Sequence, residues 1–231
     1  MSEQYVQYKV EDSVAIIHMD DGKANALGPQ MIEALREAFN RANTEANAVV
    51  LVGREGKFCA GFDLKIMTSG IEAAHKLVAN GADLYLQIYG FAKPVVVACT
   101  GHAMAGGALM LLVGDTRIGT KGPFKVGLNE VSIGMPLPIL GQELARDRLA
   151  PQHLVAACVQ ATIYSPEEAV EVGYLDKVEA GEDLVASALA EAKRLGKLPG
   201  GAYGHTKRVM RQRTIDYIRE TLASDLPGQP T

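Results

Sequence analysis

Residues 94–113 read PVVVACTGHAMAGGALMLLV, and the rest of the architecture can be built outward from them. The stretch begins with an apolar run, Val95 to Cys99, typical of a strand that is covered on both faces. A loop with glycines at 101, 106 and 107 follows, and Ala108 to Val113 then predicts a short buried helix. A strand that leads through a loop into a helix is the repeating unit of α/β proteins.

The same alternation extends on both sides of this stretch. Further strands are predicted at Val14–Met19, Ala48–Val52, Asp115–Gly119 and Phe124–Val126. After Gly28-Pro29, a dipeptide suited to a helix start, Ile32, Leu35 and Phe39 recur at helical spacing. The chain is therefore expected to have the α/β fold class, with helical crossover connections.

After Gly141 the sequence changes character and predicts helices only. Residues 165–168 (SPEE) have the pattern of a capping box with proline in the first helical turn, and Gly173 ends that helix. Two longer helices are expected at Glu182–Leu195 and Tyr203–Leu222. The tail from Pro227 to Thr231 is expected to be disordered.

The composition excludes several classes of function. The chain has 231 residues, 48% apolar and 22% charged, with a net charge of −4, which fits one globular domain with a modest appendage. It has no basic block for nucleic acid, and its longest apolar run is too short to cross a bilayer. The 3 cysteines and 5 histidines match no metal motif. The N-terminus lacks a basic start and an apolar stretch, so a cytoplasmic location without a secretory signal is expected.

The loop from Gly101 to Gly107 has the features of an anion-binding loop. Its glycines let the backbone approach a ligand, and the helix that follows starts with unpaired N–H groups. A phosphate, a carboxylate or the oxyanion of a carbonyl could use such donors. The loop lacks the Gly-Lys-Ser/Thr of a nucleotide-binding loop and the Gly-x-Gly-x-x-Gly of a dinucleotide site. Taken alone, it could equally serve tight strand–helix packing.

A second loop narrows the choice among these ligands and the purely structural role. Residues 58–64 (FCAGFDL), together with the Gly106-Gly107 loop, resemble the crotonase superfamily, also called the enoyl-CoA hydratase/isomerase family. In that family the N–H groups of the alanine in an Ala-Gly-x-Asp loop and of the first glycine in a Gly-Gly pair bind the thioester oxygen of an acyl-CoA. The resemblance therefore implies an oxyanion hole at Ala60 and Gly106.

Further motifs extend the resemblance over nearly the whole chain. Residues 23–27 (KANAL), 115–118 (DTRI) and 168–178 each resemble a family segment, in the right order. The resemblance implies a spiral core of ββα turns over residues 1–164, followed by a helical region, 165–231, that forms trimers or dimers of trimers. It also implies an acyl-CoA thioester substrate of fatty-acid metabolism. Coenzyme A enters as part of that substrate, and neither another cofactor nor a metal is expected.

The positions of the carboxylates indicate which reaction the protein catalyses. In hydratases of the family a glutamate lies three residues after the oxyanion-hole glycine, where this chain has Leu109; a later glutamate is retained as Glu130. Hydration needs one group to activate water and another to supply a proton. Isomerisation needs one base, which moves a proton from C2 to C4 through a thioester enolate. Residues 127–130 (GLNE) also resemble Δ3,Δ2-enoyl-CoA isomerases. Isomerisation is therefore predicted, with Glu130 as proton shuttle and its pKa raised by apolar neighbours.

The remaining candidates are expected to bind substrate or to shape the loops. Asp63 is expected to orient its loop by turn hydrogen bonds, and His102 to line the site. Lys207 resembles the family residue near the CoA nucleotide, with a solvated helix lysine as the alternative. The predicted substrate-binding set is Lys23, Asn25, Ala26, Leu27, Ala60, Gly61, Asp63, Leu64, His102, Gly106, Leu109 and Lys207.

Two alternatives stay open. The first is another enzyme on the same scaffold, such as a hydratase that uses Glu143 as its second carboxylate, or a lyase or hydrolase. Covalent catalysis by Cys59 is a minor variant of this alternative, because no base is paired with Cys59 in the sequence. The second is a non-catalytic acyl-CoA-binding protein, since one family glutamate is missing. None of these motifs encodes the acyl chain length.

Overall fold

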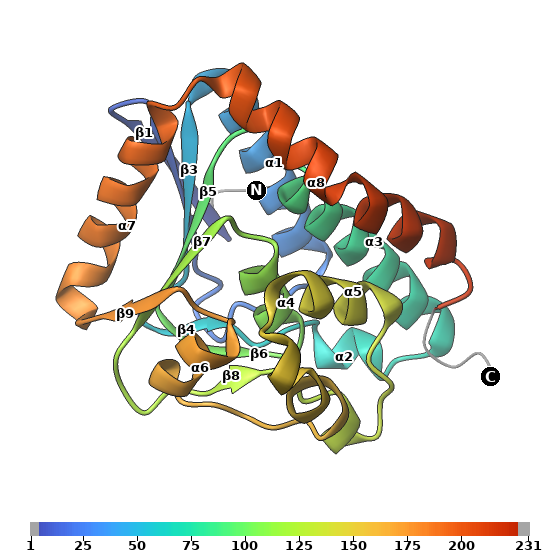
Figure 1. The fold of residues 1–231 in the computed structure, drawn as a ribbon. Helices are drawn as coiled ribbons and strands as arrows, with labels where there is room; N and C mark the ends of the chain where they lie inside the picture. The colour runs from blue at the N-terminus through green and yellow to red at the C-terminus, as the bar shows by residue number, and fades with distance from the viewer. Residues whose placement is uncertain (1–4, 226–231) are drawn as a thin grey trace.

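A computed structural model describes residues 5–225, so the predicted tail at 227–231 lies outside the described residues. Figure 1 shows a central sheet with helices packed on both faces. Its strand order is β1-β2-β3-β5-β7-β9. The strands are β1 (Val6–Glu11), β2 (Val14–Met19), β3 (Ala48–Val52), β5 (Val95–Cys99), β7 (Thr116–Thr120) and β9 (Lys177–Glu179). β1 pairs antiparallel with β2, and the other neighbours pair in parallel.

A smaller parallel sheet lies below the central sheet in the view of Figure 1. It is made of β4 (Gly56–Cys59), β6 (Gly101–Met104) and β8 (Val126–Gly127), in that order. Each of these strands leads directly into one of the segments singled out above: β4 into residues 60–64, β6 into residues 105–107, and β8 into the segment that contains Glu130. The small sheet therefore brings the predicted site segments together.

The helices complete the two layers around the central sheet. They are α1 (Pro29–Glu45), α2 (Leu64–Met67), α3 (Ile71–Tyr89), α4 (Gly106–Leu112), α5 (Ile139–Arg148), α6 (Pro166–Val172), α7 (Gly181–Gly196) and α8 (Gly200–Thr221). Three single turns join them: η2 (Val131–Ile133), η3 (Pro151–His153) and the π-helical turn η4 (Val155–Val159).

The central sheet is buried on both faces, which explains its apolar strands. All of β3 is buried. Val49 and Leu51 belong to the large cluster that includes residues of α1, α3 and α4, whereas Val50 packs on the opposite face, where α7 supplies Leu184 and Ala188. Full burial of a valine or leucine side chain contributes about 1.5–3 kcal/mol to the stability of the folded state. A sheet whose strands are covered on both faces therefore contributes much of the stability of this fold.

The predicted elements agree with the structure where the apolar pattern is strong. β2, β3 and β5 have the predicted bounds, and α6 begins with the predicted capping box at Ser165 and ends at Gly173 in the left-handed conformation. The strands predicted at 115–119 and 124–126 lie slightly later, as β7 and β8.

Two predictions about the fold are wrong. The segment after Gly141 is not purely helical, because β9 pairs with β7 and extends the central sheet. The loop predicted at 101–107 contains β6 in its first half. Both missed strands are short and carry polar residues, such as Lys177 and His102, and their pairing partners lie far away in the sequence. Local patterns therefore gave no sign of them.

Candidate active site

Two glycine-bearing loops touch at Gly61 and Gly106. A Cβ built on Gly61 would lie 3.0 Å from the Gly106 nitrogen, and Gly61 has φ +89°, a conformation that side chains rarely adopt. A Cβ on Gly107 would lie 2.0 Å from the carbonyl oxygen of Cys59. Backbone therefore meets backbone here, which is why this contact needs glycine on both sides.

The Gly106 peptide is held in a fixed orientation. Ala105, just before it, has φ 50° and ψ −122°, a strained conformation for a residue with a side chain. The buried Tyr85 hydroxyl donates to the Gly106 carbonyl oxygen at 2.7 Å. Among the described residues, the Gly106 N–H group has no hydrogen-bond acceptor. An oriented and unpaired N–H group of this kind can bind an oxyanion.

The Ala60 N–H group, the other predicted donor, is already engaged. It donates to the Ala24 carbonyl oxygen at 3.0 Å, and Leu27 N–H donates to the Gly61 carbonyl oxygen at 2.8 Å. The loop after β4 is therefore fastened to residues 24–27. For Ala60 to bind an oxyanion, its N–H group has to be shared with Ala24 or released from it.

Glu130 is a buried carboxylate close to these loops. It follows β8, where Gly127 accepts a hydrogen bond from the Ala105 N–H group at 3.0 Å. Its side chain is 8% exposed, and its Oε2 atom has no hydrogen-bond partner among the described residues. Burial raises the Glu130 pKa above its usual value. Burial also raises the Tyr85 pKa, and the charges of Cys59 and Glu130 raise it further. Glu130 thus lies within electrostatic reach of the tyrosine that holds Gly106.

Leu109 occupies the place of the missing glutamate and is a core residue. It is 2% exposed, in α4. A Cβ added to Gly141 in α5 would lie 3.4 Å from Leu109 Cδ2, so α4 and α5 are closely packed there. This position offers no group that could activate or protonate water.

Asn25 fixes the loop after β2. It is fully buried, with φ 53°. Its side-chain amide donates to the carbonyl oxygens of Met19 at 3.0 Å and Phe58 at 3.1 Å, and its Oδ1 atom accepts from the Asp21 N–H group at 3.0 Å. Asn25 therefore ties β2 to β4, and its neighbours Lys23 (exposed) and Ala26 (half-buried) are more accessible. Leu27 is fully buried.

Asp63 and Leu64 lie at the start of α2. The Asp63 Oδ1 atom accepts from Lys65 N–H at 2.9 Å and caps the helix, in the role expected from turn chemistry. Leu64 is 67% exposed, which leaves its side chain accessible to a ligand at the surface.

His102 is engaged with the segment before β8. Its Nδ1 atom accepts from the Lys125 N–H group at 3.0 Å, and its ring packs edge-on against Phe124. Partial burial lowers its pKa, and the charges of Lys57 and Lys125 lower it further. The side chain of His102 thus contacts residues 124–125, in the segment before β8.

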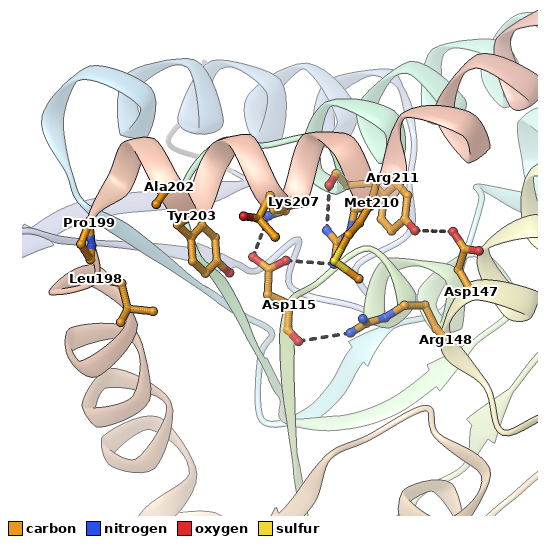
Figure 2. Close-up of a pocket in the computed structure, with 12 residues that line it drawn as sticks. Asp115, Asp147, Arg148, Leu198, Pro199, Ala202, Tyr203, Lys207, Met210 and Arg211 are labelled. Carbon is orange, nitrogen blue, oxygen red and sulfur yellow. Dashed lines mark hydrogen bonds and ion pairs between the residues drawn. The ribbon is translucent and has the colours of Figure 1, made fainter.

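Lys207 lies in a buried ion-pair cluster, so the alternative of a solvated helix lysine is wrong. Its Nζ atom is 2.6 Å from Asp115 Oδ2, and Arg211 approaches Oδ1 of the same carboxylate at 3.0 Å. Figure 2 shows both cations reaching down from α8 toward Asp115, with Arg148 approaching from α5. The cluster borders a cavity of about 580 Å³. Burial lowers the Lys207 pKa to about 8.

This cluster lies away from the two glycine loops. Asp115 directly precedes β7 and accepts a hydrogen bond from Val95, the first residue of β5. The glycine loops instead follow β4 and β6, the strands that come after the carboxyl ends of β3 and β5. Parallel strands place these two kinds of ends at opposite edges of a sheet. The structure thus separates Lys207 from the other predicted site residues.

The alternative catalytic groups lie in other surroundings. Glu143 forms an ion pair with Arg146 on α5 and borders a groove shared with α8. Cys59 is fully buried, and burial raises its pKa to about 12, which disfavours the thiolate. Within residues 5–225 no cluster of three or more metal-binding side chains is found.

The sequence did not single out Tyr85 as a site residue. It is one of the buried residues of α3, and its bond to Gly106 joins residues far apart in the chain. A tyrosine among aliphatic core residues is the one local sign, because a buried hydroxyl needs a partner.

Known proteins resemble this chain in sequence and in fold. A family model described as enoyl-CoA hydratase/isomerase matches residues 9–226. An enoyl-CoA hydratase/isomerase family protein from Pseudomonas syringae has a crystal structure with a TM-score of 0.95 and 40% identity, covering 97% of this chain and 98% of that one.

Relatives named for both reactions are similar to this chain. Enoyl-CoA delta isomerase 1, mitochondrial, of Homo sapiens is 28% identical over 211 residues, covering 89% of this chain and 70% of its own. The probable enoyl-CoA hydratase of Bacillus subtilis is 26% identical over 194 residues, covering 82% and 74%. Proteins named for the two reactions are therefore about equally similar to the chain in sequence identity.

In the part of the chain that the structure describes, no helix is long and apolar enough to span a membrane.

Proposed function

Since the chain belongs to the enoyl-CoA hydratase/isomerase family, we propose that it converts 3-enoyl-CoA to 2-enoyl-CoA thioesters, with Glu130 as the only proton-transfer group. The observation that carries the proposal is a buried Glu130 whose Oε2 atom has no hydrogen-bond partner among residues 5–225, in a chain that has the apolar Leu109 where hydration would need a second carboxylate.

The proposed reaction passes through a thioester enolate. Glu130 takes a proton from C2, the negative charge moves to the thioester oxygen, and Glu130 returns the proton to C4. A carboxylate whose pKa is raised by burial both accepts and releases a proton more readily near neutral pH than an exposed one.

The oxyanion donors are the second part of the proposal. The Gly106 N–H group is unpaired among the described residues, and the Ala60 N–H group is held by Ala24. We expect substrate binding to draw the Ala60 N–H group toward the thioester oxygen, since hydrogen bonds in unliganded active sites often tighten only with substrate. Loss of one such donor typically costs about 3–4 kcal/mol of transition-state stabilisation.

Glu130→Gln tests the proposal. Glutamine keeps the size of the side chain but cannot accept the proton, so we expect isomerisation to fall by about 10²–10⁴-fold, measured as growth of the conjugated absorbance of 2-enoyl-CoA. Glu143→Gln is the matched control and should keep the parent rate. Isomerisation by Glu130→Gln within a few-fold of the parent would rule out Glu130 as the shuttle, and loss of isomerisation in Glu143→Gln would show that Glu143 takes part in the proton transfer.

The wider setting belongs to the same proposal. We place the reaction in fatty-acid metabolism, in the cytoplasm, and expect a trimer or a dimer of trimers formed through the helical C-terminal region. A metal or a cofactor other than the coenzyme A of the substrate is not needed for the proton transfer described.

A further inference from the structure

Helix α3 contacts both of the glycine-bearing loops of the candidate active site. Tyr85 contacts the loop after β6, where its hydroxyl donates to the Gly106 carbonyl oxygen at 2.7 Å. Gly81 contacts the loop after β4, where a Cβ built on it would lie 2.3 Å from Cε1 of Phe62. Gly81 and Tyr85 are one helical turn apart, so they lie on the same face of α3. One face of one helix therefore supports both segments that carry the proposed oxyanion donors.

The Tyr85 hydrogen bond holds Gly106 from its second side. The peptide that carries the Gly106 N–H group is held at its other end, the Ala105 oxygen. This oxygen accepts from Ala108 N–H at 2.8 Å and from Leu109 N–H at 3.1 Å. The next peptide, whose oxygen belongs to Gly106, is held by Tyr85. Because a glycine has no Cβ to restrict its dihedral angles, hydrogen bonds on both sides are needed to keep its N–H group in one direction.

The Tyr85 hydroxyl is a permanent donor. Its side chain is fully buried, and burial raises its pKa well above the usual tyrosine value. The charges of Cys59 and Glu130 raise this pKa further. The hydroxyl also lies against the glycine itself, since a Cβ built on Gly106 would lie 2.8 Å from its oxygen. Tyr85 therefore keeps its proton, and its bond to Gly106, over the pH range in which proteins are folded.

Phe62 anchors the loop after β4 in a corresponding way. It lies two residues beyond Ala60, and its ring occupies the space over Gly81 that a helix side chain would otherwise fill. The ring also packs edge-on against Tyr85, with the ring centroids 6.2 Å apart and an interplanar angle of 73°. Glycine is less favourable than alanine inside a helix, so the space it leaves for Phe62 explains its presence in α3.

We propose that Tyr85 and Phe62 are positioning residues, which together hold the two oxyanion donors at the spacing that one thioester oxygen requires. Tyr85 acts on the Gly106 N–H group through its hydroxyl. Phe62 acts on the Ala60 N–H group through its packing on Gly81. This inference rests on the proposed function, because it concerns the donors of the same oxyanion hole.

Tyr85→Phe tests the first of these roles, because it removes the hydroxyl and keeps the ring. We expect kcat for a 3-enoyl-CoA ester to fall by about tenfold and KM to stay within about twofold, since the lost bond acts on the transition state. Tyr89→Phe is the matched control. Tyr89 is buried one turn further along α3, and its hydroxyl donates to Asp147 of α5. This control should keep the parent kcat even where it lowers stability, and equal losses of kcat in the two variants would overturn the role of Tyr85.

A double-mutant cycle tests the role of Phe62. The three atoms nearest to a Cβ on Gly81 all belong to Phe62, so in Gly81→Ala the ring has to move. We expect kcat/KM to fall by about tenfold or more, because a small misplacement of the donor loop costs this much. In a Phe62→Ala background the same substitution meets no ring and should change kcat/KM by less than about twofold. An equal effect of Gly81→Ala in both backgrounds would overturn the role of Phe62.

A spectroscopic probe separates this inference from the proposed function. A cinnamoyl-CoA thioester with a para-dimethylamino group absorbs at longer wavelength when its thioester oxygen accepts hydrogen bonds, and the shift needs no turnover. At saturation we expect the same red shift with the parent and Tyr89→Phe, and a smaller one with Tyr85→Phe and Gly81→Ala. If no 3-enoyl-CoA ester is isomerised, the proposed function fails, and the probe still decides on the positioning residues. No red shift in the parent, or the full red shift in both Tyr85→Phe and Gly81→Ala, would contradict the inference.

Discussion

Glu130 is buried, lies near the glycine loops, and has an Oε2 atom without a hydrogen-bond partner in the described part of the chain. The sequence predicted this residue and the direction of its pKa shift, because its segment resembles a known family segment and its neighbours are apolar. It could not predict that the Ala60 N–H group would be held by Ala24, since that bond depends on how two distant loops meet. For the same reason Tyr85 went unrecognised.

The burial of Glu130 has a cost in stability that depends on pH. Because its pKa is raised in the folded state, the folded protein holds the proton to higher pH than the unfolded chain does. The cost of the buried charge is therefore absent at acidic pH and present above the folded pKa.

Glu130→Gln should consequently be more stable than the parent at neutral pH. Glutamine removes the buried charge, and we expect a gain of about 1–3 kcal/mol in the free energy of unfolding, the usual penalty for an unsatisfied buried group. Urea titrations should show this gain shrinking as the pH is lowered toward 4.5, the usual glutamate value. A variant less stable than the parent at neutral pH would mean that Glu130 has a stabilising partner in solution.

The elements around the site differ in how readily the sequence reveals them. β2, β3 and β5 are continuous apolar runs, because both faces of the central sheet are covered, and their bounds were predicted correctly. β6 and β9 are short and mixed in character, so only their long-range pairing defines them. The contact between the two glycine loops is likewise a product of the small sheet, which places β4 beside β6.

Gly61→Ala tests this contact. The added methyl group would lie 3.0 Å from the Gly106 nitrogen, the proposed oxyanion donor, in a backbone with φ +89°. We expect kcat/KM to fall by more than 100-fold, equivalent to the loss of one donor. Gly22→Ala is the control, since Gly22 has a similar φ of +73° with nothing within 4 Å of an added Cβ. Equal effects of the two substitutions on kcat/KM would show that backbone strain, and not the blocked donor, is responsible.

Across the whole molecule, the central sheet separates two groups of polar residues. The glycine loops follow β4 and β6, beyond the carboxyl ends of β3 and β5. Lys207 and Arg211 instead meet Asp115 (Figure 2), which directly precedes β7. The partners of Asp115 could not be predicted from the sequence, because they depend on α8 returning across the fold. The ion pairs of Lys207 and Arg211 with Asp115 thereby hold α8 against the start of β7.

Lys207→Met should therefore lower stability and leave substrate binding nearly unchanged. Removing one partner of a buried ion pair commonly costs 3–5 kcal/mol, and because Arg211 still pairs with Asp115 we expect about 3 kcal/mol. Thermal unfolding and KM for an acyl-CoA ester measure the two effects separately. A large rise in KM with unchanged stability would instead support the role near the CoA nucleotide that the family resemblance implies.

The choice between isomerisation and hydration is decided by one comparison of substrates. The protein is incubated in parallel with a 3-enoyl-CoA and a 2-enoyl-CoA ester of the same length, and the conjugated absorbance is followed in both. A buried Glu130, with Leu109 where hydratases have a second glutamate, predicts that absorbance grows with the 3-enoyl ester and stays constant with the 2-enoyl ester. Steady loss of absorbance from the 2-enoyl ester, with no conversion of the 3-enoyl ester, would contradict this account and identify a hydratase.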